Sequence, residues 1–129
     1  MAVSPDIRIL VVDDFLPIRK AIIETLKLLK FNNVEDAENG IVALEKMEAE
    51  KFDLVISDWV MPEMDGLELL TNIKSNEKLK SVPVMMVTAE AAPENIVKAI
   101  KAGAANYIVK PITVKTLSTK IQKIFDAAS

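Results

Sequence analysis

Residues 53–66, DLVISDWVMPEMDG, join a short apolar run to a helix signal and so indicate how this part of the chain folds. The run at 54–57 has the composition of a buried strand, and it ends in a carboxylate, Asp58. Asp65-Gly66 then places an N-cap residue where a helix would begin. A buried strand that ends in an acid and is followed by a helix is typical of α/β folds.

The same pattern recurs along the whole chain. Apolar runs predict five strands, and Asn39-Gly40 and Pro93 mark further helix beginnings, while Gly103 marks a helix end. Strict alternation of short strands with helices of 10 to 15 residues favours right-handed crossovers. We therefore predict an α/β fold, a doubly wound five-stranded parallel sheet with helices on both faces. The predicted strands are 7–12, 34–36, 54–57, 82–87 and 107–109.

The composition excludes several classes of protein. The 129 residues carry a net charge of −3 and contain neither cysteine nor histidine. An acidic chain does not favour nucleic acid as a partner, and the missing side chains exclude disulfides, thiolate or imidazole metal sites and a serine triad. The three glycines mark element boundaries, so no phosphate-binding glycine loop can be assembled. No apolar run is long enough for a membrane span, and we expect a cytoplasmic monomer of one domain.

Polar side chains follow four of the predicted strands. Asp13 and Asp14 follow the first, Asp58 the third, Thr88 the fourth and Lys110 the fifth. The carboxyl ends of parallel strands meet at one edge of a sheet, which is where ligands bind in open α/β folds. We expect these five residues to converge there.

Three carboxylates at one edge must either take up protons or bind a cation among them. Two unit charges 4 Å apart repel by about 4 kcal/mol at an effective dielectric of 20. Mg²⁺ accepts one or two carboxylates and prefers oxygen ligands, so Asp13 and Asp14 are candidate metal ligands. Asp58 is then placed to accept a phosphoryl group as an aspartyl phosphate, with Thr88 and Lys110 as partners of the phosphoryl oxygens.

These motifs resemble a known family. The pair DD at 13–14 and the words SDWVMPEMDG, MMVTAE and NYIVKP resemble, at matching spacings over the whole chain, the receiver domain of two-component response regulators, most closely single-domain chemotaxis regulators of the CheY type. The resemblance implies a flavodoxin-like fold over residues 1–129 with a short tail at 1–6, and a signalling phosphoacceptor rather than an enzyme. It also implies a chemotaxis-type histidine kinase as the phosphoryl donor.

The same resemblance implies roles for individual residues. Mg²⁺ would be held by Asp13, Asp14, Asp58 and the backbone carbonyl of Val60, and Lys110-Pro111 would be a cis peptide. Thr88 and Tyr107 would be switch residues that move when Asp58 is phosphorylated. The output face would be formed by the fourth helix, the fifth strand and the fifth helix. Five lysines are expected on or near that face, namely Lys98, Lys101, Lys115, Lys120 and Lys123.

Departures from the family pattern leave alternatives open. Motor-binding members carry a lysine pair that contacts the flagellar motor switch protein FliM where this chain has Ala92-Pro93. A phosphate sink, or a receiver with a non-motor output, is therefore an alternative to control of flagellar rotation. A phosphatase of the haloacid dehalogenase type is a weaker alternative. Such enzymes have a second Asp two residues beyond the nucleophile, where this chain has Val60, and usually a cap domain.

Overall fold

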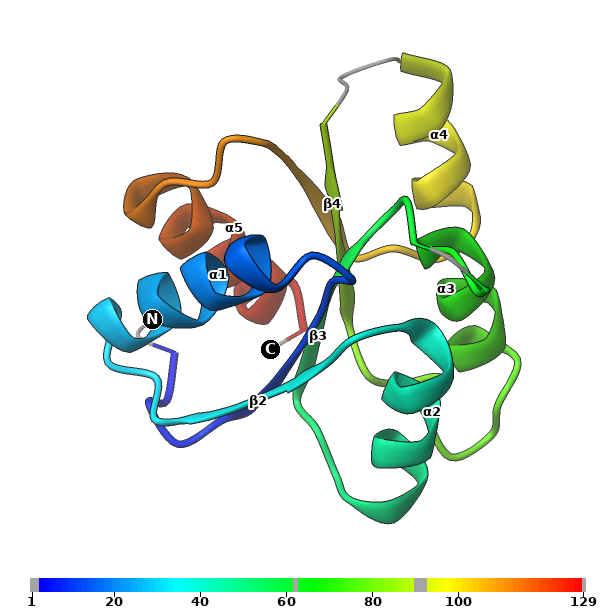
Figure 1. Ribbon diagram of the computed structural model, residues 1–129, viewed down its shortest axis with the longest axis horizontal. Helices are drawn as coiled ribbons and strands as arrows, with labels where there is room; N and C mark the ends of the chain where they lie inside the picture. The colour runs from blue at the N-terminus through cyan, green and yellow to red at the C-terminus, as the bar shows by residue number, and fades with distance from the viewer. Residues whose placement is uncertain (1–2, 62, 90–92, 129) are drawn as a thin grey trace.

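The computed structural model describes residues 3–61, 63–89 and 93–128, in which five strands and five helices alternate (Figure 1). Within these ranges, no helix combines the length and apolar character needed to cross a membrane. The elements in chain order are β1 (Arg8–Val12), α1 (Leu16–Leu28), β2 (Asn33–Ala37), α2 (Gly40–Ala49), β3 (Leu54–Asp58), α3 (Gly66–Lys74), β4 (Val84–Thr88), α4 (Pro93–Lys101), β5 (Asn106–Val109) and α5 (Val114–Ala128).

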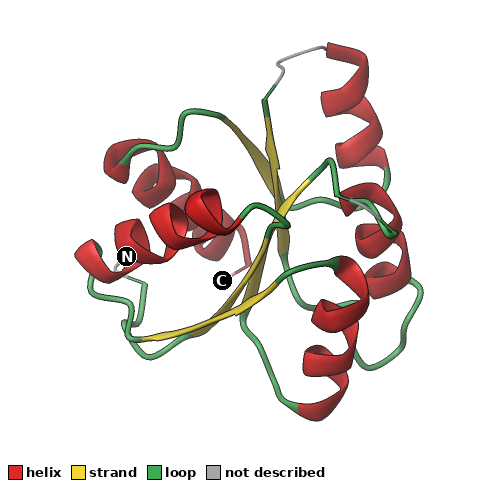
Figure 2. Cartoon of the chain, viewed as in Figure 1, coloured by secondary structure: helices red, strands yellow, loops and turns green. Residues whose placement is uncertain are grey.

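The strands form one parallel sheet in the order β2-β1-β3-β4-β5, with β5 at one edge. Helices α1 and α5 cover one face of the sheet, while α2, α3 and α4 cover the other (Figures 1 and 2). The predicted doubly wound parallel α/β fold is therefore confirmed.

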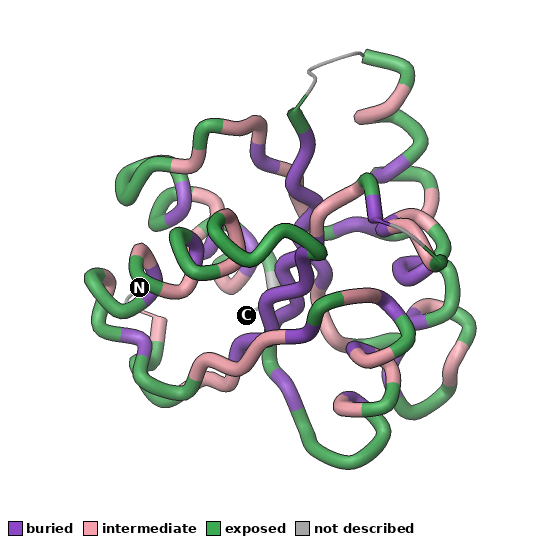
Figure 3. Tube along the Cα trace, in the orientation of Figure 1, coloured by how far each residue is buried: buried purple, intermediate pink, exposed green. Residues whose placement is uncertain are grey.

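Alternate residues of each strand supply two separate cores, because successive side chains of a strand point to opposite faces. In β1, Ile9 and Val11 pack with α1 and α5, whereas Leu10 and Val12 pack with α2, α3 and α4. The three central strands, β1, β3 and β4, are the most deeply buried part of the described chain (Figure 3). Strands buried on both faces explain why the sequence shows continuous apolar runs instead of alternating ones.

Side-chain caps set the predicted helix beginnings. The side-chain amide oxygen of Asn39 accepts a hydrogen bond from the backbone N–H of Val42 at 2.8 Å, and the Asp65 carboxylate accepts one from the N–H of Glu68 at 2.8 Å. Both caps satisfy backbone donors that the first helical turn leaves unpaired. At the end of α4, Gly103 has a φ of 106°, which favours glycine.

The predicted strand limits were wrong by one or two residues at several ends. The first strand begins at Arg8 and not at residue 7, and β4 begins two residues late because the N–H of Val82 donates to Leu79 in a turn at 2.9 Å. The third and fourth strands each extend one residue further than predicted, through Asp58 and Thr88. Two of the candidate site residues are thus the last members of strands and are held by the ladder itself.

A hollow of about 560 Å³ lies at the opposite, amino-terminal edge of the sheet. It is lined by residues of the segments that lead into β3 and β4, among them Phe52 and Leu79. None of the five strand-end residues lines this hollow, so it is separate from the polar cluster described below.

Candidate functional site

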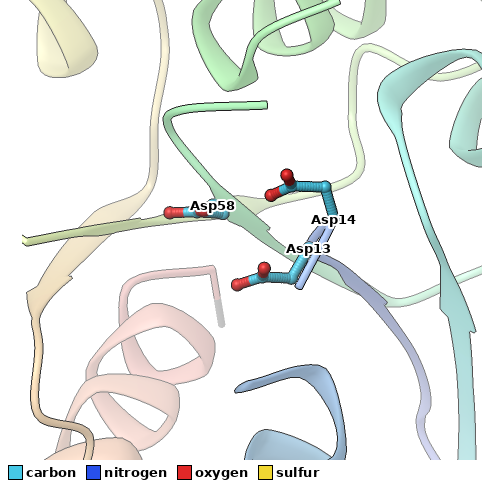
Figure 4. Close-up of side chains that lie close together, drawn as sticks. All are labelled: Asp13, Asp14 and Asp58. Carbon is cyan, nitrogen blue, oxygen red and sulfur yellow. The ribbon is translucent and has the colours of Figure 1, made fainter. Parts of the chain in front are cut away.

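The sheet brings the strand-end residues to its carboxyl edge. Asp13 and Asp14 follow β1, Asp58 ends β3, Thr88 ends β4 and Lys110 follows β5. Because β1, β3, β4 and β5 are consecutive in the sheet, the four strand ends are neighbours. Carboxylate oxygens of the three acids lie within 4.8 Å of one another (Figure 4).

Asp58 is largely buried and is held through one of its two oxygens. Its side chain is 12% exposed, and Oδ1 accepts a hydrogen bond from the N–H of Trp59 at 2.9 Å. The ammonium group of Lys110 lies 3.4 Å from the same oxygen. Among the described residues, no hydrogen bond reaches the second oxygen, Oδ2.

Asp13 is the most buried member of the cluster, with 1% of its side chain exposed. Oδ1 accepts a hydrogen bond from the N–H of Phe15 at 2.9 Å, whereas Oδ2 is buried without a hydrogen-bond partner in the described part of the chain. Lys110 is 3.9 Å from Oδ2, close enough for attraction but beyond hydrogen-bond length. A buried carboxylate oxygen without a partner is costly unless a cation binds it.

Both buried carboxylates resist ionisation. Burial raises the pKa of Asp58 above its usual 3.8, and the Lys110 ammonium and the Trp59 N–H only partly oppose the shift. Burial also raises the pKa of Asp13, against the Phe15 N–H, and the neighbouring Asp58 and Asp14 raise it further. A divalent cation would relieve this unfavourable charge, and an all-oxygen donor set suits Mg²⁺. The residues present therefore fit a magnesium site.

The backbone around Lys110 directs the lysine into the site. The N–H of Lys110 donates to the carbonyl of Thr88 at 2.8 Å, which continues the pairing of β4 with β5. The Lys110-Pro111 bond is cis, as expected from the family resemblance. Thr88 is buried, with 9% exposure.

Gly66 has a role in the site beyond beginning α3. Its N–H donates to the carbonyl of Trp59 at 2.7 Å, and a Cβ at this position would lie 2.2 Å from the carbonyl oxygen of Asp58. Only glycine allows α3 to approach the end of β3 so closely. The Asp-Gly pattern predicted the helix beginning, but nothing in the sequence indicated this contact.

The remaining candidate residues are Val60, Tyr107 and Ala92. Val60 follows β3 and is 77% exposed; because its aliphatic side chain has no donor atom, any contribution to a metal site would come from its backbone carbonyl. Tyr107 is half-buried on β5 and packs against the core beneath α2, α3 and α4. Ala92, at the position of the motor-contacting lysine pair, lies outside the described residues.

The lysines assigned to the output face are not equivalent. The Lys120 ammonium lies 4.5 Å from the centre of the Tyr107 ring and 3.3 Å from the side-chain oxygen of Asn106. This cation–π contact links α5 to β5 through Tyr107, the expected switch residue. The remaining four, Lys98, Lys101, Lys115 and Lys123, are exposed on α4 and α5.

Sequence reasoning missed one arginine that touches the site. Arg19, in the first turns of α1, donates from Nη1 to the backbone carbonyl of Asp13 at 2.8 Å and from Nε to Asp36 at 2.6 Å. An arginine one helical turn beyond an acidic pair was the only available signal.

Comparison with known proteins agrees with this geometry. The family described as response regulator receiver domain matches residues 9–122. The chain belongs to this family. It is 46% identical over 123 residues to chemotaxis protein CheY-3 of Vibrio cholerae serotype O1, covering 95% of each chain. It is 44% identical over 119 residues to chemotaxis protein CheY of Pseudomonas aeruginosa, covering 92% of this chain and 96% of that protein.

Solved structures agree with the same assignment. The structure of the chemotaxis protein CheY4 of Vibrio cholerae superposes with a TM-score of 0.86 at 34% identity, covering 92% of this chain and 98% of that chain. The flavodoxin-like, CheY-like fold is thus confirmed, and this receiver domain is of the CheY type. Proteins of this type are signalling proteins rather than classical enzymes.

Proposed function

We propose that this receiver domain is a phosphorylation-activated switch of chemotaxis-type two-component signalling, with Asp58 as phosphoacceptor and a chemotaxis-type histidine kinase as donor. The observation that carries the proposal is the pair of buried carboxylates, Asp13 and Asp58, with the Lys110 ammonium 3.9 Å and 3.4 Å from them. The names of the curated relatives support chemotaxis as the setting. We further propose that residues 1–129 act as one receiver domain.

The reaction is a transfer of the phosphoryl group between two proteins. Oδ2 of Asp58 attacks the phosphorus of a phosphohistidine, a new O–P bond forms, and the N–P bond breaks. The imidazole of the kinase leaves with the electron pair of that bond and takes up a proton from solvent. The chain contains no histidine, so the donor imidazole belongs to the kinase.

The metal ligands we propose are those named by the family resemblance: Asp13, Asp14, Asp58 and the backbone carbonyl of Val60. When bound, Mg²⁺ neutralises charge that develops on the phosphoryl oxygens. The chain contributes the placement of its carboxylates and a buried setting, in which each electrostatic interaction is stronger than in water.

Phosphorylation then adds charge that the site must balance. The acyl phosphate on Asp58 would carry about 1.5 to 2 negative charges in place of the single charge of the carboxylate, together with three acceptor oxygens. Lys110 is already within 3.4 Å of the acceptor carboxylate and would pair with one oxygen, while the Thr88 hydroxyl would donate to another. Movement of Thr88 would open space for Tyr107 and alter the surface formed by α4, β5 and α5.

The direct test is intact mass spectrometry after incubation with acetyl phosphate and Mg²⁺. Wild type is expected to gain one phosphoryl group, and Asp58→Ala none. Asp53→Ala is the matched control, because Asp53 precedes the same strand but binds the backbone of Arg8 at the far edge of the sheet. Phosphorylation of Asp58→Ala to the wild-type level would refute the assignment of the phosphoacceptor.

A binding measurement separates the output hypotheses. If the output is flagellar rotation, beryllofluoride with Mg²⁺ should increase affinity for the amino-terminal peptide of FliM. An unchanged affinity would favour a phosphate sink or a non-motor output. Repeated turnover of p-nitrophenyl phosphate by each molecule would instead support the phosphatase alternative.

A further inference from the structure

We propose that Arg19 is a positioning residue for the metal site, acting by fixing the peptide group that joins Asp13 to Asp14. The inference rests on the proposed function, because it concerns the Mg²⁺ site on which phosphoryl transfer depends. Arg19 would touch neither the metal ion nor the phosphoryl group. Its effect would pass through the backbone that carries the two acidic residues.

The backbone polar groups of Asp13 are both engaged beyond the end of β1. Its N–H donates to the carbonyl of Ala37 on β2 at 3.2 Å, and its carbonyl accepts from Nη1 of Arg19 at 2.8 Å. With Oδ1 held by the N–H of Phe15, Oδ2 is the one polar atom of Asp13 to which no described residue donates a hydrogen bond. Asp13 is therefore fixed on three sides, with one oxygen left for a ligand.

The carbonyl held by Arg19 also orients the next residue. The carbonyl of Asp13 and the backbone nitrogen of Asp14 belong to one planar peptide group. Fixing that plane fixes the direction in which the chain enters Asp14, whose side chain is exposed and cannot be positioned by packing. One guanidinium group thus controls the relative placement of both carboxylates.

Arg19 is itself rigidly held, as a positioning residue must be. Its side chain is 14% exposed, and Nε donates to the Asp36 carboxylate at 2.6 Å. Asp36 lies on β2 opposite Val11, and its carbonyl accepts from the Lys46 ammonium at 2.7 Å. The planar guanidinium can bond Asp36 and the Asp13 carbonyl at once, which a lysine cannot reproduce.

Charge and geometry predict opposite effects when Arg19 is replaced. Removing a nearby positive charge would by itself strengthen Mg²⁺ binding. Releasing the Asp13–Asp14 peptide would weaken it, because the free backbone must be ordered again when the ion binds. Loss of residues that orient metal ligands typically reduces metal affinity 10- to 100-fold. Whether the Mg²⁺ affinity rises or falls therefore shows whether Arg19 acts through its charge or by holding the Asp13–Asp14 peptide.

The experiment is a titration with MgCl₂ alone, followed by the fluorescence of Trp59 and by calorimetry. We expect Arg19→Gln to raise the Kd for Mg²⁺ about 10-fold, at the lower end of the range for residues that orient metal ligands. Arg19→Lys keeps the charge and should fall between this variant and wild type. The control Arg8→Gln makes the same charge change and breaks ion pairs with Glu35 and Glu50 at the far end of β1; its Kd should stay within about twofold of wild type.

Urea unfolding of each variant, measured in parallel, shows which variants are folded. If Arg19→Gln does not fold, the test uses Arg19→Lys. If the folded Arg19 variants bind Mg²⁺ as tightly as wild type, or more tightly, the inference is wrong, but the proposed function is unaffected. An equal loss of affinity in Arg8→Gln would overturn it too, because a general loss of stability would then explain the effect. If wild type binds no Mg²⁺, the proposed function fails, and the inference falls with it.

Discussion

Replacing Asp13 by Asn should stabilise the fold when no divalent cation is present. Asn keeps the oxygen that accepts from Phe15 and removes a charge from a site that is 1% exposed. Carboxylates within 4.8 Å repel by about 3.5 kcal/mol or more at an effective dielectric of 20, whereas Lys110 at 3.9 Å attracts by about 4.3 kcal/mol. Repulsion from one neighbouring carboxylate nearly cancels the attraction to Lys110. The burial of Asp13 and the repulsion from the second carboxylate therefore make the charge on Asp13 destabilising.

The expected gain for Asp13→Asn is about 1 to 2 kcal/mol of unfolding free energy at pH 7, a typical cost for a buried polar group without a partner. The pH dependence has a definite sign. Because the folded pKa values of Asp13 and Asp58 are raised, the folded state binds more protons than the unfolded state between pH 3.8 and those raised values. Stability attributable to these groups therefore falls as pH rises through that window, and the variant should show less of this fall than wild type.

The assay is urea unfolding of wild type and Asp13→Asn in EDTA and in saturating MgCl₂. In EDTA the variant should be the more stable protein. In MgCl₂ wild type should gain about 2.7 kcal/mol when Mg²⁺ is at 100 times its Kd, and the variant should gain clearly less. A variant less stable than wild type in EDTA, or equally stabilised by Mg²⁺, would refute the electrostatic reasoning.

Three further predictions concern other parts of the site and its supporting core. Gly66→Ala should lower the free energy of unfolding by about 1 to 3 kcal/mol because its Cβ would meet the carbonyl oxygen of Asp58. Gly40→Ala should lower it less in the same urea assay, because the atoms nearest its Cβ belong to the flexible side chain of Met64. Lys110→Gln should lower stability in EDTA by about 1 to 3 kcal/mol, since it leaves buried carboxylates without their counter-charge, and an unchanged urea midpoint would contradict this. Leu69→Ala should lower the free energy of unfolding by about 2 to 5 kcal/mol because Leu69 is fully buried on the side of α3 that packs in the core, and a smaller loss would indicate that the core closes over the cavity.

Local patterns predicted the elements of the fold well because the local and tertiary forces agree. Asn39 and Asp65 cap the helices that they were expected to begin, and Gly103 adopts the left-handed conformation at the end of α4. Strand ends were less predictable. Asp58 and Thr88 are polar, and only pairing with the neighbouring strand holds them in the ladder, which periodicity does not reveal.

The candidate site was predictable in its acids and lysine because parallel topology alone brings strand ends together. The contacts that orient these residues could not be predicted from the sequence. Arg19 binds a backbone carbonyl, and Gly66 matters through the space it leaves empty beside Asp58. Neither contact has a signature in residue type or spacing, because each depends on how a helix packs against a strand end.

The central claim is that the acids at the ends of β1 and β3 form one Mg²⁺-dependent phosphoacceptor. Treatment with acetyl phosphate, followed by borohydride reduction of any acyl phosphate and peptide mass spectrometry, locates the modified residue directly. We predict modification at Asp58, within residues 53–66, in MgCl₂ and almost none in EDTA. Modification at another residue, or equal modification in EDTA, would contradict the account.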